Sequence, residues 1–311
     1  MSEQRILVVR LGAMGDIIHT LPAVASVKQS FPHCHLAWAV EERWAPLLEG
    51  NPFVDEIILI GRRTLSGMLA LRRRLRAARF DAAIDFQGLL KSAITASLGR
   101  PERIFGLHRS QARESLAALF YSAATKTTAA HVVDRNIELA ASAGATAIAR
   151  TFFVPTGRPE GTLPAGDFVL ANPLAGWGSK QWPLEHYLQL AARLDLPLVL
   201  NVPRPVEAPG AHVHVSGIPG LIDATRRAVA VVGVDSGPLH LAAALGKPGV
   251  AIFGPTDPSR NGPYGSSMAV LRSANASTTY KRHSEIAASM SSIGPDQVLS
   301  ALANALSKTV R

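Results

Sequence analysis

The sequence predicts an α/β protein built from two domains, each containing a parallel sheet. Short apolar, β-rich segments alternate with segments of helical periodicity in both halves of the 311-residue chain, which is the pattern of βαβ units. A glycine- and proline-rich stretch at 155–166 separates the halves and is typical of a linker. The length also fits two domains, at roughly 100–200 residues each.

The first half is expected to open with a strand and to continue as βαβ units. Its expected strands cover residues 5–10, 35–40, 55–60 and 80–86, with further short elements at 103–106 and 114–123. Apolar residues at helical spacing predict helices at 17–30 and 65–79. Pro22 is tolerated because it falls in the early turns of the first of these helices.

The second half repeats the same plan. Its expected strands cover residues 168–172, 196–202, 228–234 and 249–253. Its expected helices cover residues 184–194, 239–245 and 294–306, the last with Pro295 near its start. The run AVAVVGV at 228–234 is the most apolar of the strands, which predicts that it is buried.

Composition excludes several classes of protein. Apolar residues make up 47% of the chain and charged residues 18%, which is enough to build cores and excludes a disordered or fibrous chain. The single cysteine, Cys34, excludes a disulfide framework and a cysteine-based zinc cluster, and it fits a reducing compartment. Neither a signal peptide nor a transmembrane helix is expected, so we expect a cytoplasmic protein.

Positive charge is concentrated in one segment. The formal net charge is +9, and seven arginines lie between Gly61 and Phe80 without an acidic residue. This segment can meet anionic lipid head groups, nucleic acid or a phosphorylated substrate, or it can be a solvated helix face. Nucleic acid is disfavoured because aromatic residues total only 6% and do not interleave with basic ones.

The loop after the first strand is the first candidate site. It contains Gly12, Met14, Gly15 and Asp16, and ligands of parallel sheets bind at the carboxyl ends of strands. The spacing matches neither GxGxxG nor a P-loop, so a dinucleotide or triphosphate cradle is disfavoured. Asp16 is either a helix cap or a general base in a cleft.

Two loops of the second half can hold a diphosphate. One has the sequence Asp235-Ser236-Gly237-Pro238-Leu239-His240 and opens a helix, where backbone N–H groups bind anions. It can also be an ordinary strand-to-helix turn capped by Asp235. The other loop, 176–183, carries Lys180, whose ammonium group can neutralise a phosphate.

The remaining candidates are weaker. The segment 85–92 (DFQGLLKS) follows a strand and points toward the same crevice as the first loop. No Asp-x-Asp motif occurs, which argues against a nucleotide-sugar site organised by a divalent metal, and no metal site is expected.

Taken together, these loops resemble the ADP-heptose:lipopolysaccharide heptosyltransferases of glycosyltransferase family 9, and most of all their heptosyltransferase I branch. The resemblance rests on segments that occur in the right order along the chain, namely 15–22, 85–92, 112–121, 180–183, 235–240 and 253–258.

The resemblance implies an α/β fold of the GT-B type, with two Rossmann-like domains whose parallel sheets face a central cleft. Residues 1–157 are then the acceptor-binding domain, 166–290 the nucleotide-sugar-binding domain, and 294–311 a helix that packs back on the first domain. It implies an inverting, metal-independent transfer of heptose from ADP-heptose to the Kdo inner core of lipopolysaccharide. No cofactor is expected, and ADP-heptose is the donor substrate.

The resemblance also implies roles for individual residues. Asp16 corresponds to the general base, within the loop of Gly12, Met14 and Gly15. The implied donor-binding residues are Lys180, Asp235, Ser236, Gly237, Pro238, Leu239 and His240, with Glu207 the one acid available for the ribose. The implied acceptor-binding residues are Arg62, Arg63, Arg113, Gln87 and Lys91.

The expected partners are the nucleotide-sugar donor, Kdo-lipid A and the anionic cytoplasmic face of the inner membrane. No nucleic-acid partner is expected, and the protein is expected to be a monomer. Two alternatives remain open: a nucleotide-sugar epimerase or hydrolase of similar fold, and a non-catalytic protein that binds the membrane surface.

Overall fold

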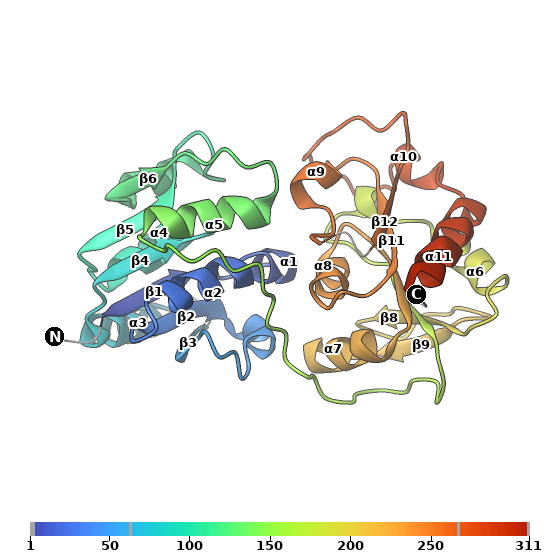
Figure 1. Cartoon of the computed structure of the whole chain (residues 1–311), viewed down its shortest axis with the longest axis horizontal. Helices are drawn as coiled ribbons and strands as arrows, with labels where there is room; N and C mark the ends of the chain where they lie inside the picture. The colour runs from blue at the N-terminus through green and yellow to red at the C-terminus, as the bar shows by residue number, and fades with distance from the viewer. Residues whose placement is uncertain (1–3, 62–63, 266–267, 310–311) are drawn as a thin grey trace. The chain divides into compact units, whose positions relative to one another are not determined.

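A computed structural model of the protein describes residues 4–61, 64–265 and 268–309 (Figure 1). The chain divides into two compact units, Met1–Pro155 and Thr156–Arg311. Each unit contains one six-stranded sheet flanked by helices, so the predicted α/β class is confirmed.

The sheet of the first unit has the strand order β3-β2-β1-β4-β5-β6, and its strands pair in parallel. The strands are β1 (Arg5–Val9), β2 (His35–Glu41), β3 (Glu56–Ile60), β4 (Ala82–Asp85), β5 (Arg103–Leu107) and β6 (Ala123–Thr125). In the register, Val9 lies between Ala39 of β2 and Asp85 of β4. The loops that follow β1 and β4 therefore start side by side.

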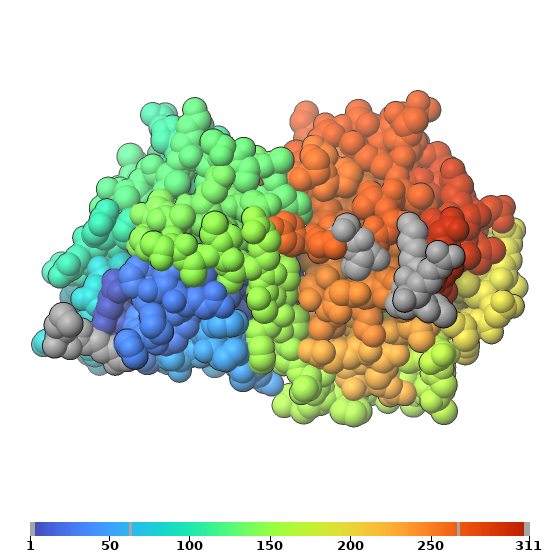
Figure 2. All heavy atoms as spheres, viewed as in Figure 1, coloured from blue at the N-terminus to red at the C-terminus, as the bar shows by residue number. Residues whose placement is uncertain are grey.

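The helices of the first unit are α1 (Met14–Ile18), α2 (Leu21–Ser30), α3 (Leu65–Ala78), α4 (Leu90–Leu98) and α5 (Val132–Ser142), with 3-10 helices at Glu42–Leu47 and Ser115–Phe120. The single helix expected at 17–30 is thus two helices. Pro22 lies in the first turn of α2, where its missing N–H has no helical partner to lose. The sequence pattern did not predict α5, which packs beside α2 (Figure 1). The chain after α5 also lies against the end of α2, where Thr146 N–H donates to Ser30 Oγ at 2.9 Å, and Figure 2 shows light green atoms of this part of the chain beside blue ones.

The core of the first unit lies between the sheet and its helices. Apolar residues of β1 and β2, such as Leu7, Val9 and Ala39, are fully buried there. Helix α3 contributes the buried Leu75, whereas its residues from Leu65 to Ala70 are all exposed. The amino-terminal half of α3 is therefore only loosely packed on the unit.

The second unit repeats this topology, with the order β12-β11-β10-β7-β8-β9 and parallel pairing. Counted along the chain of each unit, both sheets have the strand order 3-2-1-4-5-6 of Rossmann-type domains. The strands are β7 (Val169–Asn172), β8 (Leu198–Val202), β9 (His212–Val215), β10 (Ala230–Val234), β11 (Gly249–Phe253) and β12 (Met268–Arg272). As predicted from its apolar sequence, β10 is buried throughout.

The helices of the second unit are α6 (Leu184–Ala191), α7 (Ile218–Arg227), α8 (Gly237–Ala244), α9 (Pro258–Asn261), α10 (Ala288–Ser291) and α11 (Pro295–Thr309), with a 3-10 turn at Gly178–Lys180. None of the helices in the described part of the chain combines the length and apolar character that a membrane span requires.

Helix α11 packs on α6 and β11. Its side chains Val298 and Leu302 are buried in the same core as Val232 and Ile252. The buried face of this helix thus belongs to the core of the second unit, and the expected packing of residues 294–311 on the first domain stays a prediction. The periodicity of residues 294–306 predicts an apolar face without specifying which core receives it.

The stretch between the two halves is held by hydrogen bonds rather than free. Arg158 N–H donates to the carbonyl of Pro219 at 3.1 Å, and Glu160 accepts from Gly217 N–H at 2.7 Å. Residues that follow Pro155 therefore lie along the second unit, around the start of α7.

Candidate functional site

In the first unit, charged residues gather where β1 ends. The chain leaves β1 at Val9, passes through Arg10 to Ala13, and enters α1, which carries Asp16. Arg10 Nη2 lies 2.7 Å from Asp16 Oδ1, and Arg113 Nη2 lies 2.8 Å from both carboxylate oxygens. Ala13 N–H also donates to Asp16 Oδ2 at 3.3 Å. Asp16 is therefore both a helix cap and the centre of an ionic cluster.

The charges around Asp16 keep it ionised. Burial alone raises the pKa of this carboxyl, but the guanidinium groups of Arg10 and Arg113 and the Ala13 N–H outweigh that effect and lower its pKa below the ordinary value. Its side chain is still 13% exposed, so the carboxylate lies at the surface of the unit. The cluster thus presents an ionised carboxylate at the carboxyl end of the first sheet.

The two arginines differ in how firmly they are held. Arg10 has a side chain only 3% exposed, and it donates to the carbonyl of Phe86. Its own carbonyl accepts from Trp38 Nε1 at 3.1 Å. The side chain of Arg113 is 48% exposed. Arg10 is therefore the buried partner of Asp16, and Arg113 is its solvent-exposed partner.

The segment after β4 stabilises this cluster through hydrogen bonds of Asp85 and Gln87. Asp85 is fully buried and accepts from Gln87 N–H, Ser92 Oγ and Tyr121 Oη at 2.7–2.8 Å. Burial raises the pKa of Asp85, although these hydrogen bonds act in the opposite direction. Gln87 Oε1 accepts from Leu11 N–H at 2.8 Å. The side chain of Gln87 thus holds the loop that leads to Asp16.

Gly88 brings Arg113 to the site. Its φ of +67° is favoured by glycine, and a Cβ here would lie 3.3 Å from Ala112 Cα and Arg113 N. Its carbonyl accepts from Glu114 N–H at 2.9 Å. The close approach of these two segments places Arg113 over Asp16.

Other expected residues of the first unit lie at the edge of this cluster. Lys91 pairs with Glu41 at 3.1 Å rather than with Asp16. Gly12 packs so closely on Trp44 that a Cβ would lie 2.7 Å from its Nε1. Met14 is buried and Gly15 half-buried in α1. Arg62 and Arg63 lie outside the described residues.

The second unit has its own cluster at the carboxyl ends of β7 and β10. Lys180 Nζ lies 3.1 Å from Asp235 Oδ2, and His240 Nε2 lies 3.4 Å from Asp235 Oδ1. Burial raises the pKa of Asp235, but the hydrogen bond from His240 and the charge of Lys180 outweigh it, so the net pKa is lowered. Lys180, Asp235 and His240, predicted from separate loops, are thus brought together.

Helix α8 starts directly at this cluster. Ser236 occupies its N-cap position, Gly237 and Pro238 form its first turn, and Leu239 is buried beneath it. Backbone N–H groups at a helix start lack helical partners, and they bind anions. The hydroxyl of Ser236 is buried and has no hydrogen-bond partner among the described residues. The turn therefore offers donors beside the Lys180 ammonium group.

A segment that the sequence analysis did not single out covers the Lys180 loop. Ser179 N–H donates to the carbonyl of His283 at 3.1 Å, and a Cβ on Gly178 would lie 1.7 Å from the Ser284 carbonyl oxygen. The ring of Trp177 has Lys180 Nζ at 4.7 Å and Arg282 Cζ at 5.6 Å from its centroid. The only sequence signal for this contact is the glycine at position 178, which permits close approach of backbone.

Glu207 is not part of this cluster. It is exposed in the loop between β8 and β9, and within the described ranges no hydrogen bond or ion pair connects it to Lys180 or Asp235. The described residues also contain no group of three His, Cys, Asp or Glu side chains arranged to hold a metal ion.

Comparison with known proteins gives matches along the whole chain. The family model of Glycosyltransferase family 9 (heptosyltransferase) matches residues 68–196 and 217–289. Lipopolysaccharide heptosyltransferase 1 of Escherichia coli strain K12 is 31% identical over 302 residues, which cover 86% of this chain and 93% of that relative. The protein of the same name from Pseudomonas aeruginosa is 31% identical over 304 residues, covering 86% of this chain and 84% of its own.

Solved structures agree. The structure of E. coli heptosyltransferase WaaC with ADP matches with a TM-score of 0.74 and 28% identity, over 99% of both chains. E. coli ADP-heptose lps heptosyltransferase II matches with a TM-score of 0.79 and 21% identity, over 99% of this chain and 100% of that one. The second likeness is one of fold.

Proposed function

Because the chain belongs to glycosyltransferase family 9, the heptosyltransferases, we propose that it transfers heptose from ADP-heptose to the Kdo inner core of lipopolysaccharide. The reaction inverts the anomeric centre and needs no metal ion. The relatives named lipopolysaccharide heptosyltransferase 1 and the match to a structure with bound ADP support this substrate pair. The observation that carries the proposal is the ionised Asp16, held at the carboxyl end of the first sheet by two arginines.

The second unit binds the donor in this proposal. Lys180 and the first N–H groups of α8 are aimed at the diphosphate, and the hydroxyl of Ser236 adds one more donor. Negative charge grows on the diphosphate as it leaves, so these donors act most strongly in the transition state. Asp235, which also pairs with His240, orients Lys180. Glu207 is the acid available for the ribose hydroxyl groups.

The first unit binds the acceptor and supplies the base. The acceptor oxygen forms a bond to the anomeric carbon while the bond from that carbon to the diphosphate breaks, and Asp16 takes the hydroxyl proton. A carboxylate held by two guanidinium groups is a weak base, so one of them must leave. Arg113 is the exposed one, and anionic groups of the acceptor draw it away from Asp16. Arg62, Arg63, Lys91 and Gln87 complete the acceptor site.

We also propose that the enzyme works as a monomer at the anionic cytoplasmic face of the inner membrane, and the basic segment around α3 supports this location. Arg72 and Arg73 of α3 and Arg79 directly after it are exposed, and they attract acidic lipid head groups. The acceptor is itself part of that surface, so electrostatic attraction raises its local concentration.

The test is incubation of the protein with ADP-heptose in the presence and absence of Kdo-lipid A. ADP release that requires the acceptor, with a product heavier by one heptose, is the expected result. Equal ADP release in both reactions would instead indicate a hydrolase, and conversion of ADP-heptose to a stereoisomer without ADP release would indicate an epimerase. The matched control is Asp16→Asn, which keeps the size of the side chain and removes its charge.

A further inference from the structure

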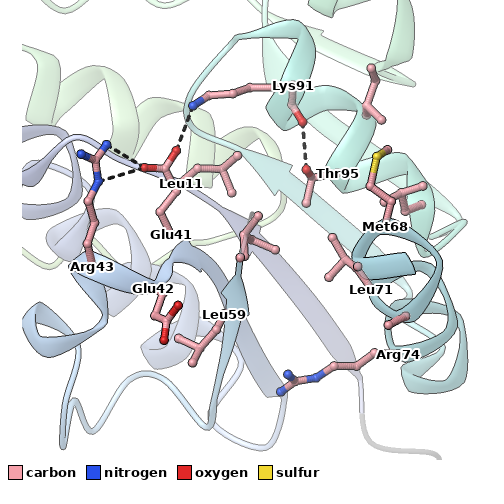
Figure 3. A pocket seen from close by; sticks show the side chains of 16 residues that line it. Leu11, Glu41, Glu42, Arg43, Leu59, Met68, Leu71, Arg74, Lys91 and Thr95 are labelled. Atoms are coloured by element: carbon pink, nitrogen blue, oxygen red, sulfur yellow. Dashed lines mark hydrogen bonds and ion pairs between the residues drawn. The ribbon is translucent and has the colours of Figure 1, made fainter. Parts of the chain in front are cut away.

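The first unit contains a pocket of about 1070 Å³ beneath α3 (Figure 3). Its walls come from β3, α3 and α4. Apolar side chains line most of these walls, namely Leu59, Met68, Leu71, Ile94 and Leu98. Pockets for small ligands typically measure roughly 300–1,000 Å³, so this one has room for an extended ligand.

The pocket exists because α3 stands away from the sheet at its amino-terminal half. Leu75 anchors the other half in the core, while Leu65 and Leu69 are 84% and 57% exposed. Leu65 and Leu69 do not line the pocket, so they add exposed apolar surface on the same helix outside it.

The pocket is polar at one end. There Glu41 accepts from Lys91 Nζ at 3.1 Å and from Arg43 Nη2 at 2.9 Å (Figure 3). Leu11 also lines the pocket and directly precedes the loop that carries Asp16. The polar end therefore adjoins the ionic cluster, while Met68 and Leu71 lie at the apolar end under α3.

This arrangement fits a ligand with a polar head and an alkyl tail. Arg72 and Arg73 of α3 are exposed, as is Arg79 directly after the helix, so the helix that forms one wall of the pocket carries positive charge that attracts anionic lipid. A purely polar ligand would leave the apolar walls unused, and a purely apolar one would not use the charged end.

We propose that this pocket binds one acyl chain of the lipid acceptor, with the sugar end of the acceptor directed toward the Asp16 loop. The inference rests on the proposed function, because it takes the acceptor to be a lipid. It adds a second point of recognition, remote from the reacting hydroxyl, that selects acylated over acyl-free acceptors.

The test uses two tryptophan substitutions on the same exposed helix. Ala70 lines the pocket, so Ala70→Trp fills it. Leu69 does not line it, so Leu69→Trp adds similar bulk outside. We expect Ala70→Trp to raise KM for Kdo-lipid A at least tenfold, with kcat and the KM for its acyl-free analogue within twofold of wild type. Leu69→Trp should change none of these values more than twofold.

A direct binding measurement separates the pocket from the reaction. The fluorescence of cis-parinaric acid should saturate with the wild-type protein and with Leu69→Trp, but not with Ala70→Trp or Met68→Asp. Circular dichroism establishes whether each variant is folded. If Ala70→Trp is not folded, Met68→Asp takes its place in both measurements.

Equal KM values of Ala70→Trp and wild type for the acylated acceptor would overturn the inference, as would parinaric acid binding that Ala70→Trp leaves unchanged. If the wild type transfers heptose to neither acceptor, the proposed function fails. The parinaric acid measurement then still shows whether the pocket binds an acyl chain, independently of the transfer reaction.

Discussion

Replacing Lys180 by alanine tests the donor site directly. Lys180 lies with its side chain 14% exposed, 3.1 Å from Asp235 and next to the start of α8. In the proposed complex its ammonium group contacts the diphosphate and leaves the adenosine untouched. We therefore expect Lys180→Ala to weaken binding of ADP and to leave binding of adenosine nearly unchanged.

The size of the effect follows from the kind of contact. A hydrogen bond to a charged group contributes about 1.5–3 kcal/mol. At about 1.4 kcal/mol for each factor of ten, the Kd for ADP should rise roughly 10- to 100-fold. Asp235 then loses Lys180 while staying buried and keeps His240 at 3.4 Å, so its less compensated charge also repels the diphosphate, which favours the upper part of this range.

The assay is isothermal titration calorimetry with ADP, AMP and adenosine. Arg193→Ala is the control, because it removes a cation of the same unit that pairs with Asp296. The double variant Lys180→Ala with Asp235→Asn should regain thermal stability but not ADP affinity. Equal losses for ADP and adenosine would refute the diphosphate role of Lys180.

Three further predictions concern the first unit. Asp16→Asn should abolish transfer, while its ADP affinity, measured by calorimetry, stays within about threefold of wild type. Because the pKa of Asp16 is lowered from 3.8, its ion pairs stabilise the folded protein above that pH. The loss of unfolding free energy in the variant should therefore shrink as the pH falls below about 4. Tyr121→Phe removes a donor to buried Asp85 and should lower the free energy of unfolding by about 1.5–3 kcal/mol. Since burial raises the pKa of Asp85, stability is lost as the pH rises and the carboxyl ionises, so urea unfolding should show a larger deficit for Tyr121→Phe at pH 8 than at pH 4. Gly88→Ala forces a left-handed conformation on alanine, at a cost of about 1–2 kcal/mol in stability, and it displaces Arg113. The KM for the acceptor should therefore rise in a transfer assay. The control Gly50→Ala, at an open position of similar φ, should lower stability without changing this KM.

Much of the fold could be predicted because its signals are local. Strands such as 249–253 and the loop from Gly12 to Asp16 follow from apolar runs and the residues that end them. The break between α1 and α2 could not, because residues 17–30 keep a helical periodicity across it.

The candidate site was only partly predictable for a similar reason. Asp16, Lys180 and Asp235 stand out in their loops, and the structure places each beside ionised partners. Arg10 did not stand out, because its role depends on the carbonyl of Phe86, 76 residues away in sequence. The contact between His283 and the Lys180 loop likewise depends on tertiary packing that no local pattern encodes.

The unequal exposure of Arg10 and Arg113 has a consequence for hydrolysis of the donor when no acceptor is bound. While Arg113 is in place, both carboxylate oxygens of Asp16 accept hydrogen bonds from it, so Asp16 is a poor base for activating a water molecule. An activated sugar bound in that interval is therefore spared from wasteful hydrolysis. In the proposed mechanism, Arg113 thus has two roles, because it recognises the incoming acceptor and keeps Asp16 from activating water before the acceptor binds.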